Sequence, residues 1–381
     1  MSRNLPPLPA PPRLAIVGFL PDQRPLPRYM CILIEGLAEA GVEIDLLLPA
    51  GGPPDDLGLD RDVPVYPLEP EDDRSALADL RRYLGERAPQ AILSNRDRSS
   101  ALLARLSRQE RPRTVLRIGT NVAEKLKGKH LVRRWWTRRR LADTFARADA
   151  LIGISDGACD ALRELLRGRR RPPIVRIYNP IDRTAFRRQA EEPISHPWFL
   201  HKEVPIVLSV GRLVRAKDYP TLLRAFRRVR ERLDCRLVIL GDGRQRKRLE
   251  GLVRSLDLTE TVDLPGFAPN PFPYMARADL FVLSSRFEGF ANVLAEALAV
   301  GTPCVATDCK SGPREILASG KYGRLVPTSD AHALADAILE TIQQRPDQAL
   351  LNEAIRRFDR DTAIGAYLEA LRLRPPSIQD P

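Results

Sequence analysis

Short apolar runs rich in valine and isoleucine recur along the chain, and longer amphipathic stretches separate them. This alternation is typical of βα units built around a parallel sheet. The first half predicts strands at Leu14–Phe19, Val42–Leu48, Ala91–Ser94, Thr114–Ile118, Ala150–Ile154 and Ile174–Ile177. The second half predicts strands at Ile206–Val210, Arg236–Leu240, Thr261–Leu264, Leu280–Leu283 and Cys304–Ala306, with extended chain at Gly323–Val326. We therefore expect an α/β protein with two doubly wound parallel sheets that face each other across a cleft.

Turn-forming residues place the boundaries between these elements. A helix over Tyr29–Ala40 is expected to end at Gly41, because glycine readily adopts the left-handed conformation of a helix cap. After Asn179-Pro180 the chain is irregular through Pro193 and Pro197, as an interdomain linker would be. The expected domains are residues 1–187 and 205–345, with a linker at 188–204 and a helical segment at 346–381.

Length and composition agree with two cytoplasmic domains. A chain of 381 residues exceeds what one hydrophobic core usually serves. Its apolar runs are far shorter than the ~20 residues that cross a bilayer, and Met1–Pro12 lacks the apolar core of a secretory signal. The cysteines are scattered and form no CxxC pair, which argues against a disulfide framework and against a zinc site. They are Cys31, Cys159, Cys235, Cys304 and Cys309.

The net charge of +12 and the pI near 9.8 imply attraction to anions, among them nucleic acids, acidic lipid head groups and phosphorylated metabolites. Arginines crowd around Trp135 and Trp136 and again over Arg167–Arg171. These blocks are either a solvated helix face with an exposed loop, or a surface that lies against anionic lipid at the inner face of a membrane.

Candidate chemistry lies in the loops that follow the second-half strands, where doubly wound sheets bind ligands. Gly211 allows a tight turn, and Arg212 and Lys217 place two cations beside the expected N-terminus of a helix that starts at Tyr219. A diphosphate suits such a place, although solvated loop charges explain the same residues. The Gly241–Gly243 turn follows the next strand and lacks the GxGxxG pattern of a dinucleotide site.

Two carboxylates, Glu288 and Glu296, stand eight residues apart across an expected strand-to-helix junction. Gly289 places Glu288 in the turn, while Glu296 lies about two turns into the helix. Carboxylates accept hydrogen bonds from the vicinal hydroxyls of ribose and hexose rings. The alternative is that Glu296 is a surface helix residue and Glu288 balances the charge of Arg286.

Four segments in this order resemble the donor-binding half of the retaining glycosyltransferases of family 4, also called group 1, which have two Rossmann-like domains in the GT-B architecture. They are the Gly211–Asp218 loop, the Gly241–Gly243 turn, the run from Glu288 to Asp308, and Ser311–Leu317. The resemblance covers Pro205–Pro327 and includes the EGF-x5-E form of the family's Glu-x7-Glu signature. It implies an acceptor-side domain first, a nucleotide-sugar donor domain second, and a C-terminal segment that packs back toward the first.

The resemblance also implies roles for residues. Arg212 and Lys217 would hold the donor diphosphate without a divalent metal or other cofactor, and Glu288 would contact the transferred sugar. Glu296 would bind the nucleotide ribose, and Gly266-Phe267 would lie near the base. The remaining donor contacts implied are Gly211 and the backbone N–H groups of Gly289, Phe290, Ala291, Asn292 and Val293.

The first half departs from the family pattern. Many relatives carry a Gly-Gly-x-x-x-Arg loop after the first strand, whereas this chain has Pro21–Arg28 without a glycine pair. The stretch Arg117–Thr120 lacks the histidine often found near that strand end. The resemblance therefore leaves the acceptor side open.

The function predicted is retaining transfer of a sugar from a nucleotide diphosphate sugar, with UDP as the first choice, to the hydroxyl of a glycan or lipid-linked acceptor in cell-envelope polysaccharide or glycoconjugate synthesis. Two alternatives stay open. One is a non-catalytic protein of the same fold that binds a polyanion such as a nucleic acid, which the charge alone favours. The other is a sugar-nucleotide epimerase, which needs no acceptor and releases free nucleotide during turnover.

Overall fold

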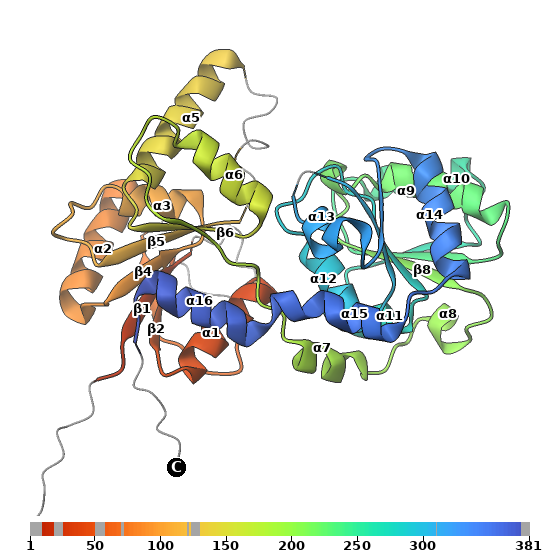
Figure 1. Cartoon of the computed structure of the whole chain (residues 1–381), viewed down its shortest axis with the longest axis horizontal. Coiled ribbons are helices and arrows are strands. Elements are labelled where there is room, and N and C mark those ends of the chain that lie inside the picture. The colour runs from red at the N-terminus through yellow and green to blue at the C-terminus, as the bar shows by residue number, and fades with distance from the viewer. Residues whose placement is uncertain are drawn as a thin grey trace, which may run out of the picture. The chain divides into compact units, whose positions relative to one another are not determined.

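The computed structural model describes residues 10–18, 26–49, 58–69, 72–119, 122, 130–309 and 311–374. The described residues form two compact units (Figure 1). The first unit contains the chain up to Ile154, then 158–180, and then the chain from Arg360 on. The second unit contains 155–157 and Ile181–Asp359. No helix among the described residues is long and apolar enough to span a bilayer.

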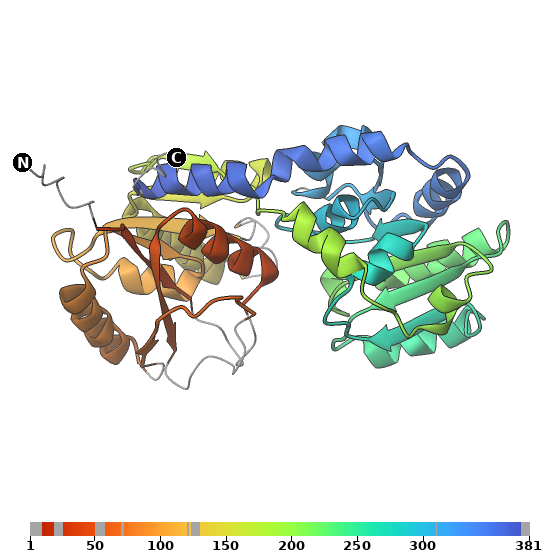
Figure 2. The same cartoon turned by 90° about the horizontal axis from the view of Figure 1, so that it is seen from below.

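A parallel sheet of seven described strands, in the order β3-β2-β1-β4-β5-β6-β7, forms the centre of the first unit. The strands are β1 (Arg13–Val17), β2 (Glu43–Pro49), β3 (Val65–Leu68), β4 (Ala91–Ser94), β5 (Arg113–Ile118), β6 (Ala150–Gly153) and β7 (Ile174–Arg176). The helices are α1 (Arg28–Glu39), α2 (Asp73–Arg87), α3 (Asp97–Leu103), α5 (Leu131–Ala146), α6 (Asp156–Leu165) and α16 (Arg360–Leu371). Alternate residues of β1 pack on opposite faces, Leu14 and Ile16 with the side chains of α1 and α16, and Ala15 and Val17 with those of α2, α3 and α5. Figure 2 shows α1 and α16 lying together over one face.

The predicted elements of this unit agree with the structure in all but one strand. Helix α1 gives way to Gly41, whose φ of +87° is the left-handed cap that the sequence predicts. Residue 19 of the first predicted strand lies outside the described residues. The sequence analysis missed β3, a short strand at the edge of the sheet that contains Pro67. A proline inside a short run argues against a strand, and only an edge position tolerates it.

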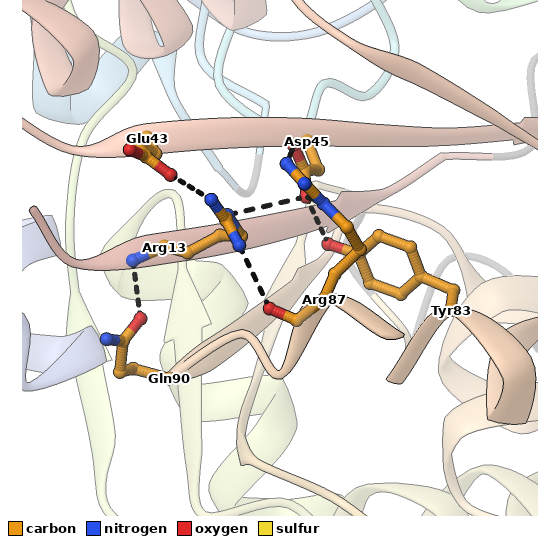
Figure 3. A network of polar contacts seen from close by, with 6 residues as sticks. All are labelled: Arg13, Glu43, Asp45, Tyr83, Arg87 and Gln90. Atoms are coloured by element: carbon orange, nitrogen blue, oxygen red, sulfur yellow. Dashed lines mark hydrogen bonds and ion pairs between the residues drawn. The ribbon is translucent and has the colours of Figure 1, made fainter. Parts of the chain in front are cut away.

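A buried polar network joins β1, β2 and α2 near the amino ends of the strands, at the edge opposite their carboxyl ends (Figure 3). Asp45 is 1% exposed and accepts hydrogen bonds from the Tyr83 hydroxyl at 2.8 Å and the Arg87 Nε at 3.3 Å. Arg13 approaches the same carboxylate at 3.8 Å and pairs with Glu43. Burial and the hydrogen bond to Asp45 raise the pKa of Tyr83, so the tyrosine stays neutral and donates.

Removing the central carboxylate of this network is expected to destabilise the first unit. In Asp45→Ala the Tyr83 hydroxyl and the Arg87 guanidinium lose their buried partner, at a cost of about 3 kcal/mol in the free energy of unfolding. Urea denaturation measures this cost. Asp160→Ala removes a carboxylate that pairs with Arg163 at 2.7 Å on the exposed face of α6, and it should change the same free energy by less than about 0.5 kcal/mol. Equal stability of the two variants would show that the buried network contributes nothing.

The second unit has a parallel sheet of six described strands in the order β10-β9-β8-β11-β12-β13. The strands are β8 (Ile206–Val210), β9 (Arg236–Leu240), β10 (Val262–Gly266), β11 (Leu280–Leu283), β12 (Cys304–Thr307) and β13 (Arg324–Val326), all at predicted places. Its helices are α7 (Arg183–Ala190), α8 (Pro197–Leu200), α9 (Tyr219–Arg230), α10 (Arg246–Ser255), α11 (Phe272–Arg277), α12 (Asn292–Ala299), α13 (Pro313–Ile316), α14 (Ala331–Gln343) and α15 (Gln348–Ile355). Helices α9, α10 and α14 supply the core on one face of the sheet.

The predicted domain boundaries need correction. The second unit begins at Ile181, and Phe186 of α7 stacks on Phe272 with ring centroids 4.3 Å apart. Residues 188–204 are not a free linker, because the Gln189 carbonyl accepts a hydrogen bond from the Asn270 side chain at 2.9 Å. His196, which precedes α8, contacts Asp263 at 3.1 Å. The predicted C-terminal segment 346–381 is shared between the two units. Its helix α15 packs on α12 in the second unit, and the chain belongs to the first unit only from Arg360 on.

Candidate functional site

The strand order of the second sheet reverses between the neighbouring strands β8 and β11, so the chain continues from these two strands toward opposite sides of the sheet, to β9 and to β12. Such a switch point is where doubly wound sheets bind ligands. The loop after β8 carries Arg212 and Lys217, and the loop after β11 carries Glu288. In the first sheet the switch lies between β1 and β4, and residues 21–25 of the atypical Pro21–Arg28 loop, like Thr120, lie outside the described residues.

Backbone hydrogen bonds join the loops that follow β8 and β9 to the carboxyl ends of the neighbouring strands β9 and β10. The N–H of Gly211 donates to the Leu240 carbonyl at 2.9 Å, and the N–H of Gly241 donates to the Gly266 carbonyl at 2.6 Å. At Gly241 φ is +133°, and a Cβ there would lie 2.1 Å from the Gly211 carbonyl oxygen. The predicted tight turn thus has a packing role, since only glycine lets these two loops approach so closely.

The loops after β8 and β11 meet at an ion pair. The Lys217 ammonium contacts a carboxylate oxygen of Glu288 at 2.7 Å, and the Ser285 hydroxyl donates to the same oxygen at 2.6 Å. The Ser284 hydroxyl donates to the Lys217 carbonyl at 2.8 Å, and the N–H of Arg286 donates to the Ala216 carbonyl at 2.8 Å. Two predicted site residues that are 71 positions apart are therefore held together by both side-chain and backbone bonds.

The ion pair between Lys217 and Glu288 leaves donors free to bind an anion. The side chains of Lys217 and Glu288 are 17% and 14% exposed, so each still reaches solvent. An ammonium group has three donors, of which Glu288 takes one. The Arg212 guanidinium is exposed and pairs with no other described residue. The loop can therefore offer two cations to a diphosphate while the Glu288 carboxylate still accepts hydrogen bonds.

One interpretation of the sequence was that Glu288 balances the charge of Arg286. The structure contradicts it. Arg286 pairs instead with the buried Asp218, at 2.9 Å from Nε. Burial of Asp218 would raise its pKa, but hydrogen bonds from Arg286, Thr221 and Ser329 outweigh that effect and lower the pKa below its ordinary value. Asp218 thus remains charged, and it anchors the loop that carries Lys217.

Glu296 lies in α12, in the second turn, with 6% of its surface exposed. The interpretation that it is a surface helix residue is therefore wrong. Gly289 and Phe290 precede the helix, Ala291 is its N-cap with a φ of +71°, and Asn292 and Val293 form its first turn. These residues present backbone N–H groups at a helix start, as the sequence predicts, and such groups favour anions.

The Ser311–Leu317 segment supports this helix start from the next loop. Gly312 has a φ of +88°, and a Cβ at this position would lie 2.1 Å from the Phe290 carbonyl oxygen. The Thr307 hydroxyl, at the end of β12, donates to the Ser285 carbonyl at 2.5 Å and lies 3.3 Å from the Leu283 carbonyl. The loop after β12 thus fixes the position of the loop that carries Glu288.

Gly266 and Phe267 lie apart from the ion pair. Gly266 ends β10, two strands from β8, which corresponds to about 10 Å across the sheet. The Phe267 side chain is 76% exposed. The structure therefore places these two residues at the same edge of the sheet as Lys217 and Glu288, and not in contact with them.

Sequence reasoning missed Ser284, Ser285, Asp218 and Thr307 as parts of the site. Each is a small polar or acidic residue at the carboxyl end of a buried strand or in the loop after it. That position was the available signal, because a polar side chain buried there needs a specific partner. Which partner it takes depends on the order of the strands.

In the first unit, the carboxyl end of β5 holds a buried cation. Arg117 is 2% exposed, lies 4.3 Å above the Tyr29 ring, and donates to the side-chain oxygens of Asn95, at 2.6 Å, and Asn179. Desolvation opposes its charge, but Tyr29 and Tyr367 outweigh that effect and raise the pKa of Arg117. Arg117 therefore stays charged, at the end of the strand near which the resemblance led us to expect a histidine.

The five cysteines are free and buried. Burial raises the pKa of Cys309 to about 12, which keeps its thiol protonated and unreactive beside the site. Among the residues that the structure describes, no three His, Cys, Asp or Glu side chains gather as metal ligands would.

Comparison with known families assigns most of the chain. Residues 26–180 match the glycosyl transferase 4-like domain, and residues 191–358 match the glycosyl transferases group 1 family.

Curated relatives match over part of their length. The chain is 39% identical over 158 residues to the N-acetylgalactosamine-N,N'-diacetylbacillosaminyl-diphospho-undecaprenol 4-alpha-N-acetylgalactosaminyltransferase of Campylobacter jejuni, a stretch that is 42% of this chain and 41% of the relative. It is 33% identical over 178 residues to the lipopolysaccharide core biosynthesis glycosyltransferase LpsE of Rhizobium meliloti, over 45% of this chain and 51% of the relative. The match thus spans about half, or less, of the length of these relatives.

Solved structures match the fold of nearly the whole chain. Anabaena HepE in complex with UDP and glucose superposes with a TM-score of 0.77 at 20% identity, over 94% of this chain and 99% of that one. A structure from E. coli described as trehalose-6-phosphate bound with UDP-2-fluoro glucose gives 0.73 at 14% identity, over 96% and 100%. These likenesses, with the two parallel-sheet units, show that the chain has the GT-B fold. The two family matches, which together cover residues 26–180 and 191–358, show that it belongs to the group 1 glycosyltransferases.

Proposed function

We propose that the chain is a glycosyltransferase that moves a sugar from a nucleotide diphosphate sugar to a hydroxyl of a glycan or lipid-linked glycan acceptor, in the synthesis of cell-envelope polysaccharide or glycoconjugates. The observation that carries this proposal is the Lys217–Glu288 pair at the switch point of the second sheet. A cation suited to phosphate and a carboxylate suited to sugar hydroxyls stand side by side there. The names of the two relatives above, one of which concerns lipopolysaccharide core biosynthesis and the other a sugar on diphospho-undecaprenol, support the class of acceptor.

In this proposal Lys217 and Arg212 bind the donor diphosphate and offset the negative charge that develops on it as the glycosidic bond breaks. Glu288 accepts hydrogen bonds from the transferred sugar, and Glu296 accepts them from the ribose hydroxyls. The N–H groups of Gly289–Val293 face the sugar and phosphates. Placing the base at Gly266 and Phe267 is consistent with the span of about 10 Å between β8 and β10.

The donor we propose is a UDP-sugar, because HepE is described in complex with UDP, with UDP-glucose, and with UDP and glucose. We further propose retention of the anomeric configuration, as the resemblance implies, and turnover that needs no metal cofactor because the two cations serve the leaving group. Action in the cytoplasm, beside a membrane that holds the acceptor, is consistent with the free, buried cysteines.

The expected result is that UDP and a UDP-sugar raise the melting temperature of the second unit, while GDP and TDP sugars raise it less. With lipid extract as acceptor, mass spectrometry should detect a sugar added to a lipid or glycan. Turnover should persist in EDTA, and the NMR coupling of the anomeric proton should be the same in donor and product.

Each alternative has its own outcome in this experiment. A polyanion-binding protein would show salt-sensitive RNA binding and no shift with any nucleotide sugar. An epimerase would release free UDP and an altered sugar with no acceptor present. Either result would overturn the proposed function.

A further inference from the structure

The first ten residues of α5, Leu131–Arg140, form a helix with almost no support from the rest of the described protein. All of them are exposed except Thr137, which is half-buried, and the core contacts of α5 come from Ala142, Thr144 and Phe145 at its other end. Figure 1 shows this end of α5 extending beyond the sheet of its own unit. Helices are stabilised mainly by packing of one face, so a length of helix that is unpacked among the described residues suits a partner beyond them.

Leu131–Arg140 also carries large apolar side chains that are exposed. Leu131, Val132, Trp135 and Trp136 have 76%, 61%, 54% and 62% of their surface accessible. The two indole rings contact each other edge to face, with centroids 5.1 Å apart. Large apolar side chains clustered on a surface mark an interaction site, and tryptophan favours the boundary between water and lipid.

Positive charge surrounds these side chains. The helix carries five arginines and one acidic residue, Asp143. Among the described residues, Arg133, Arg134 and Arg140 make no ion pair or hydrogen bond through their side chains. These guanidinium groups therefore have free donors for an anion outside the chain.

The second basic block, Arg167–Arg171, contacts the same helix further along. Arg169 pairs with Asp143, and Arg170 donates to the Ala146 carbonyl at 3.5 Å. The loop that follows α6 thus lies against the packed end of α5. We name the combined surface of Leu131–Arg140 and Arg167–Arg171 the α5 surface.

Two hollows flank Trp136 between α3 and α5, of about 650 and 610 Å³. Arg98, Arg133 and Arg140 line the first together with Asp97, and Arg105, Arg139, Arg140 and Arg147 line the second together with Asp73 and Asp143, so that arginines outnumber carboxylates in both. Each hollow combines the indole ring with guanidinium groups, and guanidinium groups bind phosphate with good geometry.

We propose that the α5 surface docks on an anionic lipid bilayer. The exposed tryptophans, Leu131 and Val132 enter the boundary between head groups and acyl chains, and the arginines bind lipid phosphates, with head groups entering the hollows beside Trp136. A nucleic acid would use the arginines but would leave Leu131 and Val132 in water, so the combination favours lipid. This inference does not depend on the proposed function.

Flotation of the full chain with vesicles tests the proposal. Binding to phosphatidylcholine vesicles that contain 30% phosphatidylglycerol is expected, with much weaker binding to pure phosphatidylcholine. Replacing Arg133, Arg134 and Arg140 by glutamine should lower the partition coefficient about 100-fold, since each basic residue contributes about fivefold at a charged surface. Trp135→Ser with Trp136→Ser should lower it at least tenfold.

The matched control replaces Arg224, Arg227 and Arg228 by glutamine, which removes the same charge from exposed positions on α9 in the second unit. This variant should bind vesicles like the unaltered chain. All variants should keep the far-UV circular dichroism spectrum, the thermal transition and the response to UDP, so that loss of vesicle binding is separated from misfolding and from failure of the proposed function.

Fluorescence identifies the residues that enter the lipid. Trp198 is the remaining tryptophan of the chain, and Trp198→Phe leaves emission from the α5 surface alone. That emission should shift to shorter wavelength on anionic vesicles and be quenched by brominated lipid. The proposal is overturned if vesicles do not bind, if the control triple loses as much binding as the α5 triple, or if RNA binds through these arginines while vesicles do not.

Discussion

Lys217→Ala is expected to lower kcat/KM for glycosyl transfer about 10³-fold, because it removes a preorganised donor aimed at the charge that develops on the leaving diphosphate. The same change leaves the Glu288 carboxylate, which is 14% exposed, beside the donor phosphates without its cation. The KM for the donor should therefore rise while kcat falls. Initial rates at varied UDP-sugar concentration separate the two effects.

The controls distinguish a role in the site from a general loss of charge. Lys247→Ala removes an exposed lysine from α10 and should leave kcat/KM unchanged. Glu288→Gln should also be strongly impaired, and the double variant Lys217→Ala with Glu288→Gln should lose less than the sum of the two single losses in activation free energy. Full activity of Lys217→Ala, or strict additivity, would contradict the assigned roles.

The sequence was sufficient to predict the two sheets because parallel strands are buried on both faces. Val207 and Leu208, for example, are both fully buried, so the strand reads as a continuous apolar run with a turn at its end. Strand β3 was not predicted, because a strand at the edge of a sheet is not buried on both faces and can contain a proline such as Pro67. The helices within residues 181–204 were not predicted either, because α7 and α8 are short and depend on contacts such as that of Phe186 with Phe272.

The candidate site, too, could be predicted from the sequence only in part. The loops that bear Lys217 and Glu288 were predictable from position alone, since each follows a buried strand. Their direct contact was not, because it requires β8 and β11 to be neighbours although β9 and β10 come between them in the chain. Local proximity was misleading at Arg286, which is two residues from Glu288 and yet pairs with Asp218.

The glycine at 312 allows the rigidity of the site to be tested without touching a ligand-binding side chain. Gly312→Ala would place a Cβ 2.1 Å from the Phe290 carbonyl oxygen at a φ of +88°, so the loop that carries Glu288 must move or strain. We expect a loss of about 3 kcal/mol in the free energy of unfolding of the second unit, from the left-handed conformation and from overpacking. We also expect the response of the melting temperature to UDP to fall, because the start of α12 is displaced.

Gly320→Ala is the matched control, because Gly320 has a φ of +103° and no atom lies within 4 Å of the position that a Cβ would take. It incurs the conformational cost alone, about 1–2 kcal/mol, and should leave the response to UDP intact. The difference between the two variants in urea denaturation therefore isolates the steric contact between the loops after β11 and β12. If Gly312→Ala is no less stable than Gly320→Ala and responds to UDP equally well, that contact does not hold the Glu288 loop in place, and the position of Glu288 must depend on the hydrogen bonds of its own loop, among them those of Lys217 and Ser285.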